Sequence, residues 1–325
     1  MISERQNIEI NIQRLAAQRY LYSRAKIIHS IRLMLILPTI LVLSILVALL
    51  KSQQVTSSIG VQAYDAFWLL ALMSIVIFAL DRFMLEPLQQ KQKAEAAAIQ
   101  EEFDCDVLQI PWNDIELPKR PAREKILSNA RHYLARHGAN KIHDWYAYPD
   151  NDLIPLPVAR AICQRSNVSW DKSLRQRYIR IVLIYGIVVS IVIIAVAAVY
   201  DLSLRSLLSA IVVPLLPVAG FVTGEIRQNR AAVNALEEIR DCIEKQWEAL
   251  VSCEPSDSDV VLKSRQLQDR IYASRKGSSL IPDWLYEKLR TSNEVVMVAT
   301  AEQMKQQYLA QQEPGADANK PRCSG

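Results

Sequence analysis

Four apolar runs, arranged as two pairs, constrain the fold of this 325-residue chain more than any other feature. The runs are Leu33–Leu50, Ala66–Leu80, Ile181–Tyr200 and Ser206–Gly224. A helix needs ~20 apolar residues to cross a bilayer core of ~30 Å, and three of the runs come near this length. The second run reaches it only with its flanking residues. The pattern predicts four transmembrane helices in two hairpins. The alternative, which is strongest for the second run, is a buried core helix of a globular protein.

Lys and Arg residues gather at one end of every apolar run, and they predict the orientation of the chain. The basic residues near these ends are Arg5, Arg14, Arg19, Arg24, Lys26, Arg32, Arg82, Lys91, Lys93, Lys172, Arg175, Arg177, Arg180, Arg227 and Arg230. The two short links, 51–65 and 201–205, offer only Lys51 and Arg205. Positive charge favours the cytoplasmic side. We therefore expect a multi-pass protein of the bacterial inner membrane with both termini in the cytoplasm. No secretory signal peptide is visible, so the first run is expected to be an uncleaved anchor.

The predicted fold class is all-α: a four-helix transmembrane protein with helical cytoplasmic segments. The expected divisions are a cytoplasmic N-terminal helix (1–32), a first transmembrane hairpin (33–86), a central cytoplasmic segment (87–179), a second transmembrane hairpin (180–224), a helical cytoplasmic C-terminal region (225–311) and a disordered tail (312–325). The charged share of 22 % is close to that of soluble proteins, which agrees with sizeable cytoplasmic parts.

Apolar spacing predicts where the helices of the cytoplasmic parts lie. The expected helices are 7–31, running on into the first span, then Leu88–Phe103, Ala122–His137, Leu156–Gln164, Asp257–Lys276, Ile281–Arg290 and Asn293–Gln311. Gly138 is the expected stop of the helix at 122–137. A further helix follows the fourth span, because apolar residues recur three or four apart at Val233, Leu236, Ile239, Ile243, Trp247 and Leu250. This stripe favours packing on the protein's own domain over a coiled coil between subunits.

No motif of covalent chemistry is present, so we expect a protein that is not an enzyme and holds no cofactor or metal. Phosphate-binding, dinucleotide, nucleophile-elbow and zinc-protease patterns are all missing, and the chain has only eight glycines. The five cysteines form no CxxC pair and are expected to be reduced thiols. Glu101, Glu102, Asp104 and Asp106 could hold a cation, but a solvated helix end is the favoured interpretation. The net charge of +4 is mild, and attraction to anionic lipid accounts for it, so no nucleic-acid polymer is expected as a partner.

Small residues in the spans suggest where helices meet. Gly186 with Ser190, and Gly220 with Gly224, form four-residue steps that let helices approach closely. Packing inside one chain and packing between subunits are both consistent with these steps. No ionisable residue lies in the middle of a span, which argues against a coupled transporter. Four such apolar helices cannot line a water channel in one chain, so a pore would require a homo-oligomer.

Several short stretches outside the spans resemble a known family. They are Leu15–Lys26 before the first span, Glu101–Asp104 and Leu108–Asn113 after the second, and Asp144–Tyr146, Cys163–Asp171 and Leu174–Arg175 before the third. Their order and placement make the chain similar to the SMODS-associated four-transmembrane effectors of bacterial anti-phage systems, over most of residues 10–310. The resemblance implies a CBASS effector in cyclic nucleotide signalling, acting beside a nucleotidyltransferase that makes a cyclic oligonucleotide on infection. It also implies a pore-former or membrane disruptor that kills the infected cell by abortive infection.

The sequence analysis therefore favours an oligomerising inner-membrane effector that permeabilises the lipid bilayer when a nucleotide signal or a partner triggers it. The alternative is a non-enzymatic membrane scaffold or signalling subunit that binds a cytoplasmic protein. A small transporter or constitutive channel is a third, weaker hypothesis.

The central segment is where aromatic rings and cations crowd together in the sequence. Stacking on rings and pairing with cations would suit a cyclic oligonucleotide. The candidate residues for binding such a signal are Arg123, Trp145, Tyr146 and Arg165. The favoured reading of the same residues is a small aromatic core with solvated cations.

Overall fold

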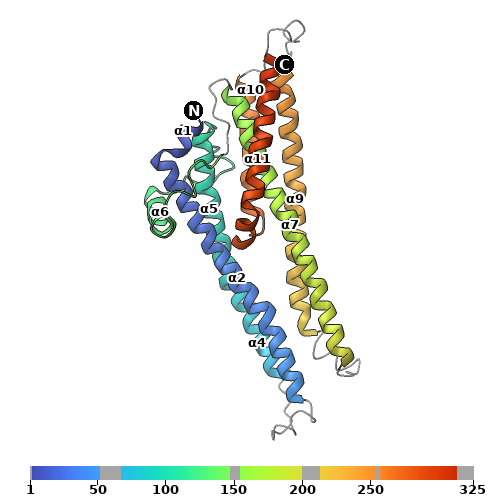
Figure 1. Ribbon diagram of the computed structural model, residues 1–325. Helices are drawn as coiled ribbons and strands as arrows, with labels where there is room; N and C mark the ends of the chain where they lie inside the picture. Colours follow the sequence, from blue (N-terminus) through green and yellow to red (C-terminus); the bar gives the residue numbers. More distant parts are fainter. Residues whose placement is uncertain (1, 52–66, 147–153, 200–212, 253–256, 313–325) are drawn as a thin grey trace. The chain divides into compact units, whose positions relative to one another are not determined.

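The computed structural model describes residues 2–51, 67–146, 154–199, 213–252 and 257–312, and within them it contains helices and no strand. The all-α prediction is confirmed. The helices, labelled in Figure 1, are α1 (Ile2–Asn7), α2 (Glu9–Lys51), α4 (Phe67–Leu80), the π-helical turn η1 (Asp81–Leu85), α5 (Glu86–Val107), α6 (Arg123–His137), α7 (Leu156–Val199), α9 (Val213–Ser252), α10 (Asp257–Gly277) and α11 (Asp283–Gln312).

Several helices are longer than the sequence predicted. The helix expected at Leu156–Gln164 continues without a break as α7. The two helices expected at Ile281–Arg290 and Asn293–Gln311 are the single helix α11, because no glycine or proline lies between them. The predicted helix 122–137 is confirmed as α6, and Gly138 follows it with a positive φ of 66°, the conformation that glycine adopts readily at a helix end. The predicted disordered tail 312–325 lies outside the described residues apart from Gln312.

The chain folds as two units, each built from separate stretches of sequence. Unit 1 comprises Met1–Arg24, Gln92–Gln176 and Arg230–Gly325, and unit 2 comprises Ala25–Lys91 and Arg177–Asn229. The division falls within α2, α5, α7 and α9, so each of these helices contributes residues to both units.

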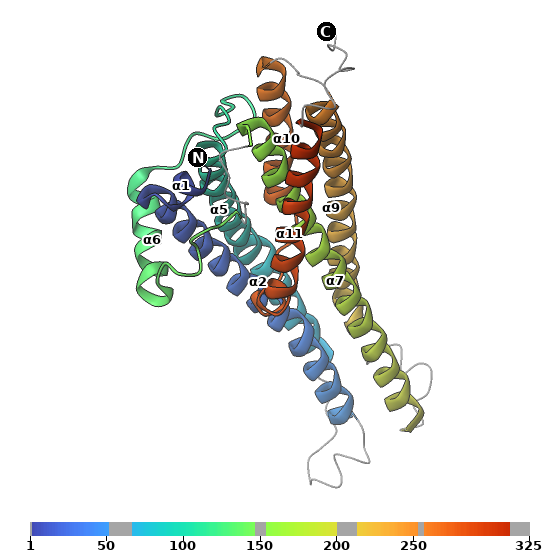
Figure 2. The ribbon, with the colours of Figure 1, turned by 45° about the horizontal axis from the view of Figure 1, so that its top comes forward.

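Unit 1 contains two main apolar clusters. In the first, Leu15 and Leu21 of α2 and Phe103 of α5 pack with Ile126 of α6. In the second, Ile162 of α7 and Trp247 of α9 pack with α10 and α11, which lie beside the C-terminal part of α9 in Figures 1 and 2. All six residues of the stripe that follows the fourth predicted span are buried, and the five from Leu236 to Leu250 pack within apolar clusters of unit 1. This confirms the amphipathic helix and its packing on the protein's own domain.

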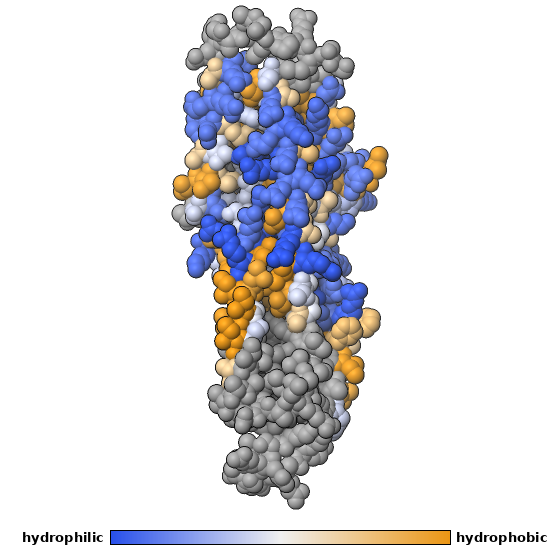
Figure 3. Space-filling model, turned by 90° about the vertical axis from the view of Figure 1, so that its right-hand side faces the viewer, coloured by the Kyte–Doolittle hydropathy of each residue, from blue (hydrophilic) through white to orange (hydrophobic). Residues whose placement is uncertain are grey.

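Unit 2 holds the described parts of the predicted spans, and many of its apolar side chains are exposed. Those on α4, η1 and α7 are Trp68, Leu72, Met73, Ile75, Val76, Phe78, Phe83, Met84, Ile181, Leu183, Ile184, Tyr185, Ile187, Val188 and Ile191. Hydrophobic side chains also gather over one part of the surface in Figure 3, and hydrophilic ones cover another.

The described parts of the four predicted spans lie on α2, α4, α7 and α9, and residues 206–212 of the fourth lie outside the described residues. Within the residues that the structure describes, however, no helix has an apolar stretch long enough to cross a membrane.

Candidate functional site

The candidate site lies in unit 1, where Trp145 and Tyr146 meet side chains from four helices. Trp145 is half-buried and Tyr146 is buried, and both rings contact Phe103 of α5, with centroids 6.4 and 6.0 Å away. The Tyr146 hydroxyl donates to Asp104 Oδ1 at 2.6 Å. The reading of the aromatics as part of a small core therefore holds for Tyr146.

The two cations predicted to bind a signal do not join these rings. Arg165 of α7 is ion-paired with Glu244 of α9, with Nε 2.6 Å from Oε1. Arg123 is the first residue of α6, and its side chain is exposed. The structure thus brings Trp145 and Tyr146 together and places the two arginines elsewhere in unit 1.

The cation that does lie against Trp145 is Arg19 of α2. Its guanidinium carbon is 5.0 Å from the Trp145 ring centroid and 4.8 Å from that of Tyr286 on α11. The Nη2 group of Arg19 donates to the Tyr286 hydroxyl at 2.8 Å. Tyr286 also contacts Trp170 of α7, at 5.7 Å between centroids. We call these four residues the Arg19 stack. The Nε of Arg19 is buried and has no hydrogen-bond partner among the described residues.

Sequence reasoning missed Arg19 and Tyr286 as members of a site. Arg19 entered the analysis as one of many basic residues near a span, and Tyr286 lies 267 residues away from it. The only local signal was that Arg19 lies within Leu15–Lys26, one of the stretches that carry the family resemblance.

A network of buried charges underlies Tyr146. Arg265 of α10 donates to Glu101 Oε1 at 2.6 Å, and Gln268 bridges Glu101 and Asp104 at 3.0 Å to each. Arg275 donates to the same oxygen of Asp104 that Gln268 contacts. The side chains of Glu101 and Asp104 are fully buried. We call Glu101, Asp104, Arg265, Gln268 and Arg275 the buried charge network.

The favoured interpretation of the acidic cluster as a solvated helix end is therefore wrong. Glu102 and Asp106 are also paired, with Arg14 of α2 at 2.9 and 3.1 Å. The physical reason is that α10 and α2 supply arginines that neutralise carboxylates which could not otherwise be buried. Among the described residues, no group of three or more His, Cys, Asp or Glu side chains could hold a metal ion.

Burial raises the pKa of several groups in and around the buried charge network. Burial raises the pKa of the Glu101 carboxyl, neighbouring Asp104 raises it further, and Arg265 opposes both. Burial also raises the pKa of the Cys105 and Cys163 thiols, so both stay protonated at neutral pH. These thiols are in a state that suits packing and not nucleophilic attack. The Tyr146 phenol likewise has a raised pKa because it is buried beside Asp104.

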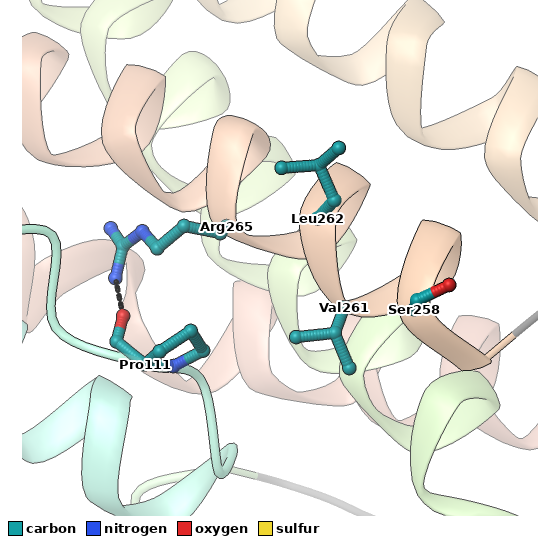
Figure 4. Close-up of a pocket in the computed structure, with 5 residues that line it drawn as sticks. All are labelled: Pro111, Ser258, Val261, Leu262 and Arg265. Carbon is teal, nitrogen blue, oxygen red and sulfur yellow. Dashed lines mark hydrogen bonds between the residues drawn. The ribbon is translucent and has the colours of Figure 1, made fainter.

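An open pocket of about 480 Å³ lies at the edge of the network. Figure 4 shows its lining: Val261, Leu262 and Ser258 from α10, and Arg265, whose guanidinium turns to Pro111 and donates to its carbonyl at 3.0 Å. Because the charge of Arg265 is already satisfied by Glu101, the pocket offers mainly apolar contact.

The predicted helix-packing positions lie in unit 2. Apart from their chain neighbours and the backbone of their own helix turn, no described atom lies within 4 Å of a Cβ built on Gly186, Gly220 or Gly224. The Ser190 hydroxyl donates to the Gly186 carbonyl at 2.8 Å within its own helix. These small residues therefore make no close helix contact with the described part of the same chain.

Comparison with known proteins fits this arrangement. The model of the SMODS-associating 4TM effector domain matches residues 1–304. A protein of Bacillus cereus (strain VD146), named as a probable CBASS effector molecule, is 27% identical over 289 residues, which cover 87% of this chain and 91% of that protein. No solved structure matches. The resemblance found in the sequence is thus confirmed, and the chain belongs to the SMODS-associating 4TM effector family.

Proposed function

We propose that this protein is an oligomerising inner-membrane effector that permeabilises the bilayer in anti-phage defence when a nucleotide signal or a partner triggers it. Membership of a CBASS effector family supports the defence role. The observation that carries the membrane step is the exposure of apolar side chains around most of the circumference of α7 in unit 2. The proposed role requires no covalent chemistry, so the protein acts without being an enzyme.

Three successive residues of α7 make this argument. Leu183, Ile184 and Tyr185 are 38%, 61% and 49% exposed. Successive helical residues point about 100° apart, so these three side chains cover most of the circumference of the helix. Each would be unfavourable in water by roughly 25 cal/mol per Å² of apolar surface. A bilayer removes that cost from all sides at once, whereas packing on one globular partner would cover a single face.

The glycine steps support self-association. Gly220 and Gly224 lie one turn apart on α9, and the described part of the same chain does not fill the space beside them. Small residues allow the close helix approach that drives association in lipid. A second copy of the chain is the partner that we propose for this face, because a monomer with such apolar spans cannot enclose water.

The Arg19 stack is the place that we propose for the trigger. It combines three aromatic rings with a guanidinium in one partly exposed cluster. Stacking on an aromatic ring contributes ~1–3 kcal/mol per base, and a guanidinium binds phosphate by paired hydrogen bonds. A cyclic oligonucleotide offers both groups. In this proposal the bases of the nucleotide stack on the rings that Arg19 contacts when no nucleotide is bound.

Expression in bacteria with and without a candidate cyclic nucleotide tests the effector role, with membrane potential as the readout. We expect depolarisation only when protein and signal are both present. Gly220→Ile with Gly224→Ile should abolish toxicity while the protein still reaches the membrane, and Val222→Leu on the same helix is the matched control. Full toxicity of the glycine double variant would remove the close-packing argument.

Reporter fusions at position 58 and at the C-terminus test the proposed topology. The two reporters should lie on opposite sides of the membrane, with the C-terminal reporter in the cytoplasm, because basic residues flank the spans on that side. A periplasmic C-terminus would contradict the proposed orientation.

Calorimetry on the detergent-purified chain tests the trigger, using a panel of cyclic di- and trinucleotides. Trp145→Ala should weaken binding about tenfold or more, because one stacking surface is lost. Leu127→Ala, at an exposed position of α6, should bind as the wild type does.

A wild-type chain that binds no nucleotide would favour the alternative role, a membrane scaffold that receives the signal from a protein partner. The exposed side chains Trp284, Val295 and Val298 of α11 favour that alternative, since they form apolar surface on unit 1. In that case Ala substitutions on α11, and not Trp145→Ala, should abolish the response to the signal in cells.

A further inference from the structure

The helix that begins with α4 passes into α5 through the π-helical turn η1. The residues on both sides of η1, Leu80 and Glu86, keep α-helical backbone angles, and the Glu86 amide donates to the Asp81 carbonyl five residues earlier. Pro87 follows directly in α5. Proline has no N–H, and in an α-helix its ring clashes with the carbonyl four residues earlier, here that of Phe83. The π turn lies just before Pro87, at the place in the helix where this clash would fall.

One side chain of α2 contacts both the first residue of this turn and a residue of α5 that follows it. The guanidinium of Arg32 bonds both carboxylate oxygens of Asp81, at 2.5 and 3.0 Å, and it donates to Gln89 Oε1 at 2.7 Å. Arg32 and Gln89 are 9% and 4% exposed. All three residues belong to unit 2. A planar guanidinium with a fixed fork of donors suits such a double contact, and a lysine ammonium does not.

The double contact depends on the π turn. Asp81 and Gln89 are eight residues apart in the sequence. In a regular α-helix this spacing turns the two side chains about 80° away from each other. A π turn takes up about one extra residue, which removes about 100° of rotation and returns the pair to within about 20° of one face. The π turn therefore aligns Asp81 and Gln89 so that the single guanidinium of Arg32 reaches both.

We propose that Arg32, Asp81 and Gln89 form a register lock that fixes the rotation of α4 about its own axis. Pro87 opens the π turn and Arg32 holds it open. When both constraints are removed, the turn closes to an α-helix, and α4 rotates by about 100° relative to α5.

The composition of α4 permits this rotation. Its sequence, FWLLALMSIVIFAL, has no charged residue, and its described side chains are apolar on several sides, including Trp68, Leu72, Ile75 and Phe78. Rotation in an apolar surrounding therefore exchanges one apolar face for another. In contrast, η1 itself carries Asp81 and Arg82, so the polar residues that select the register lie at the turn and not within α4.

The test measures the register of α4 in the full-length protein in liposomes. A spin-labelled amino acid is introduced at successive positions from Leu72 to Phe78 by stop-codon suppression, which leaves the native cysteines in place. The oxygen accessibility of each label then gives the phase of the exposed helix face. Four backgrounds are compared: wild type, Arg82→Gln, Pro87→Ala, and Pro87→Ala with Arg32→Gln.

We expect wild type, Arg82→Gln and Pro87→Ala to share one phase, and the double variant to differ by about 100°. Arg82→Gln is the matched control, because it also removes one arginine charge, here from η1 itself, where the side chain is 62% exposed and paired with Glu86. An unchanged phase in the double variant would overturn the proposal. So would a shift in Pro87→Ala alone, since Arg32 would then not hold the turn.

If the double variant does not fold, Pro87→Ala with Arg32→Lys takes its place. Lysine keeps the charge beside Asp81 but cannot bridge to Gln89, so the same shift is expected. The measurement reads helix register and not membrane permeability. Failure of the register lock would therefore leave the proposed effector function standing, and failure of that function would leave the lock standing.

Discussion

The two units of this protein differ in their most deeply buried and most exposed side chains. In unit 1 the carboxylates of Glu101 and Asp104 are fully buried, each against an arginine of α10. In unit 2 the apolar side chains of Phe78 and Ile184 are 67% and 61% exposed. A soluble domain can bury charges only when their partners come with them, and it hides apolar groups from water. Unit 1 thus neutralises its most buried carboxylates from within the chain, whereas α4 and α7 of unit 2 leave apolar side chains uncovered by the described part of the chain.

The first test of this difference removes one charge from the interior of unit 1. Asp104→Ala leaves Arg275 without its buried partner, and we expect the free energy of unfolding to fall by about 3–5 kcal/mol. Denaturant unfolding of the purified chain, followed by tryptophan fluorescence, measures the change. Glu237→Ala is the control, because Glu237 forms its ion pair with Lys172 at the surface and should matter little. Equal losses of unfolding free energy in the two variants would show that the buried charge network stabilises the fold no more than a surface ion pair does.

The second test places a charge on the apolar surface of unit 2. If lipid covers this surface, Ile191→Lys should oppose membrane insertion by about 2.5–3.5 kcal/mol, the cost of a lysine near the centre of a span. Leu127→Lys in unit 1 replaces a similarly exposed apolar residue, and we expect it to change stability by less than about 0.5 kcal/mol. The membrane-inserted fraction after expression is compared between the two variants, and that of Leu127→Lys should match the wild type. Unchanged insertion of Ile191→Lys would mean that water, and not lipid, surrounds α7.

The smallest expected effect is a pH dependence within unit 1. The pKa of Glu101 is raised in the folded state, so the folded chain holds this proton to higher pH than the unfolded chain does. The unfolding free energy should therefore contain a component that is present below the ordinary glutamate pKa and is lost as pH rises through the raised value. Glu101→Gln removes the titrating group. The difference in stability between wild type and Glu101→Gln should thus vary with pH in this direction, and a constant difference would contradict it.

Local pattern predicted much of the fold. The stripe from Val233 to Leu250 is buried as expected, and the helix expected to end at Gly138 does end there, because both depend on residues close in sequence. The length of α7 was missed, since nothing near Gln164 ends a helix and the absence of a stop is a weak signal.

The site was predicted only in part. Trp145 and Tyr146 lie together as neighbours in sequence, but their partners come from distant helices. Arg19 reaches Tyr286 across 267 residues, and Arg265 reaches Glu101 across 164. A single sequence shows that arginines and carboxylates are present, but it does not show which of them pair. For the same reason the acidic run at Glu101–Asp106 read as a solvated helix end.

The separation of these charge partners has a consequence for how the protein is made. Glu101 leaves the ribosome 164 residues before Arg265, and the second pair of apolar runs is synthesised between them. At about 5–20 residues per second, the carboxylates wait about 8–33 s for their arginines. Until α10 is made, Glu101 and Asp104 lack the arginines that neutralise them, whereas Arg14, the partner of Glu102 and Asp106, is already present. Pairing of Glu101 and Asp104 is therefore tied to the synthesis of α10, which comes after both pairs of apolar runs.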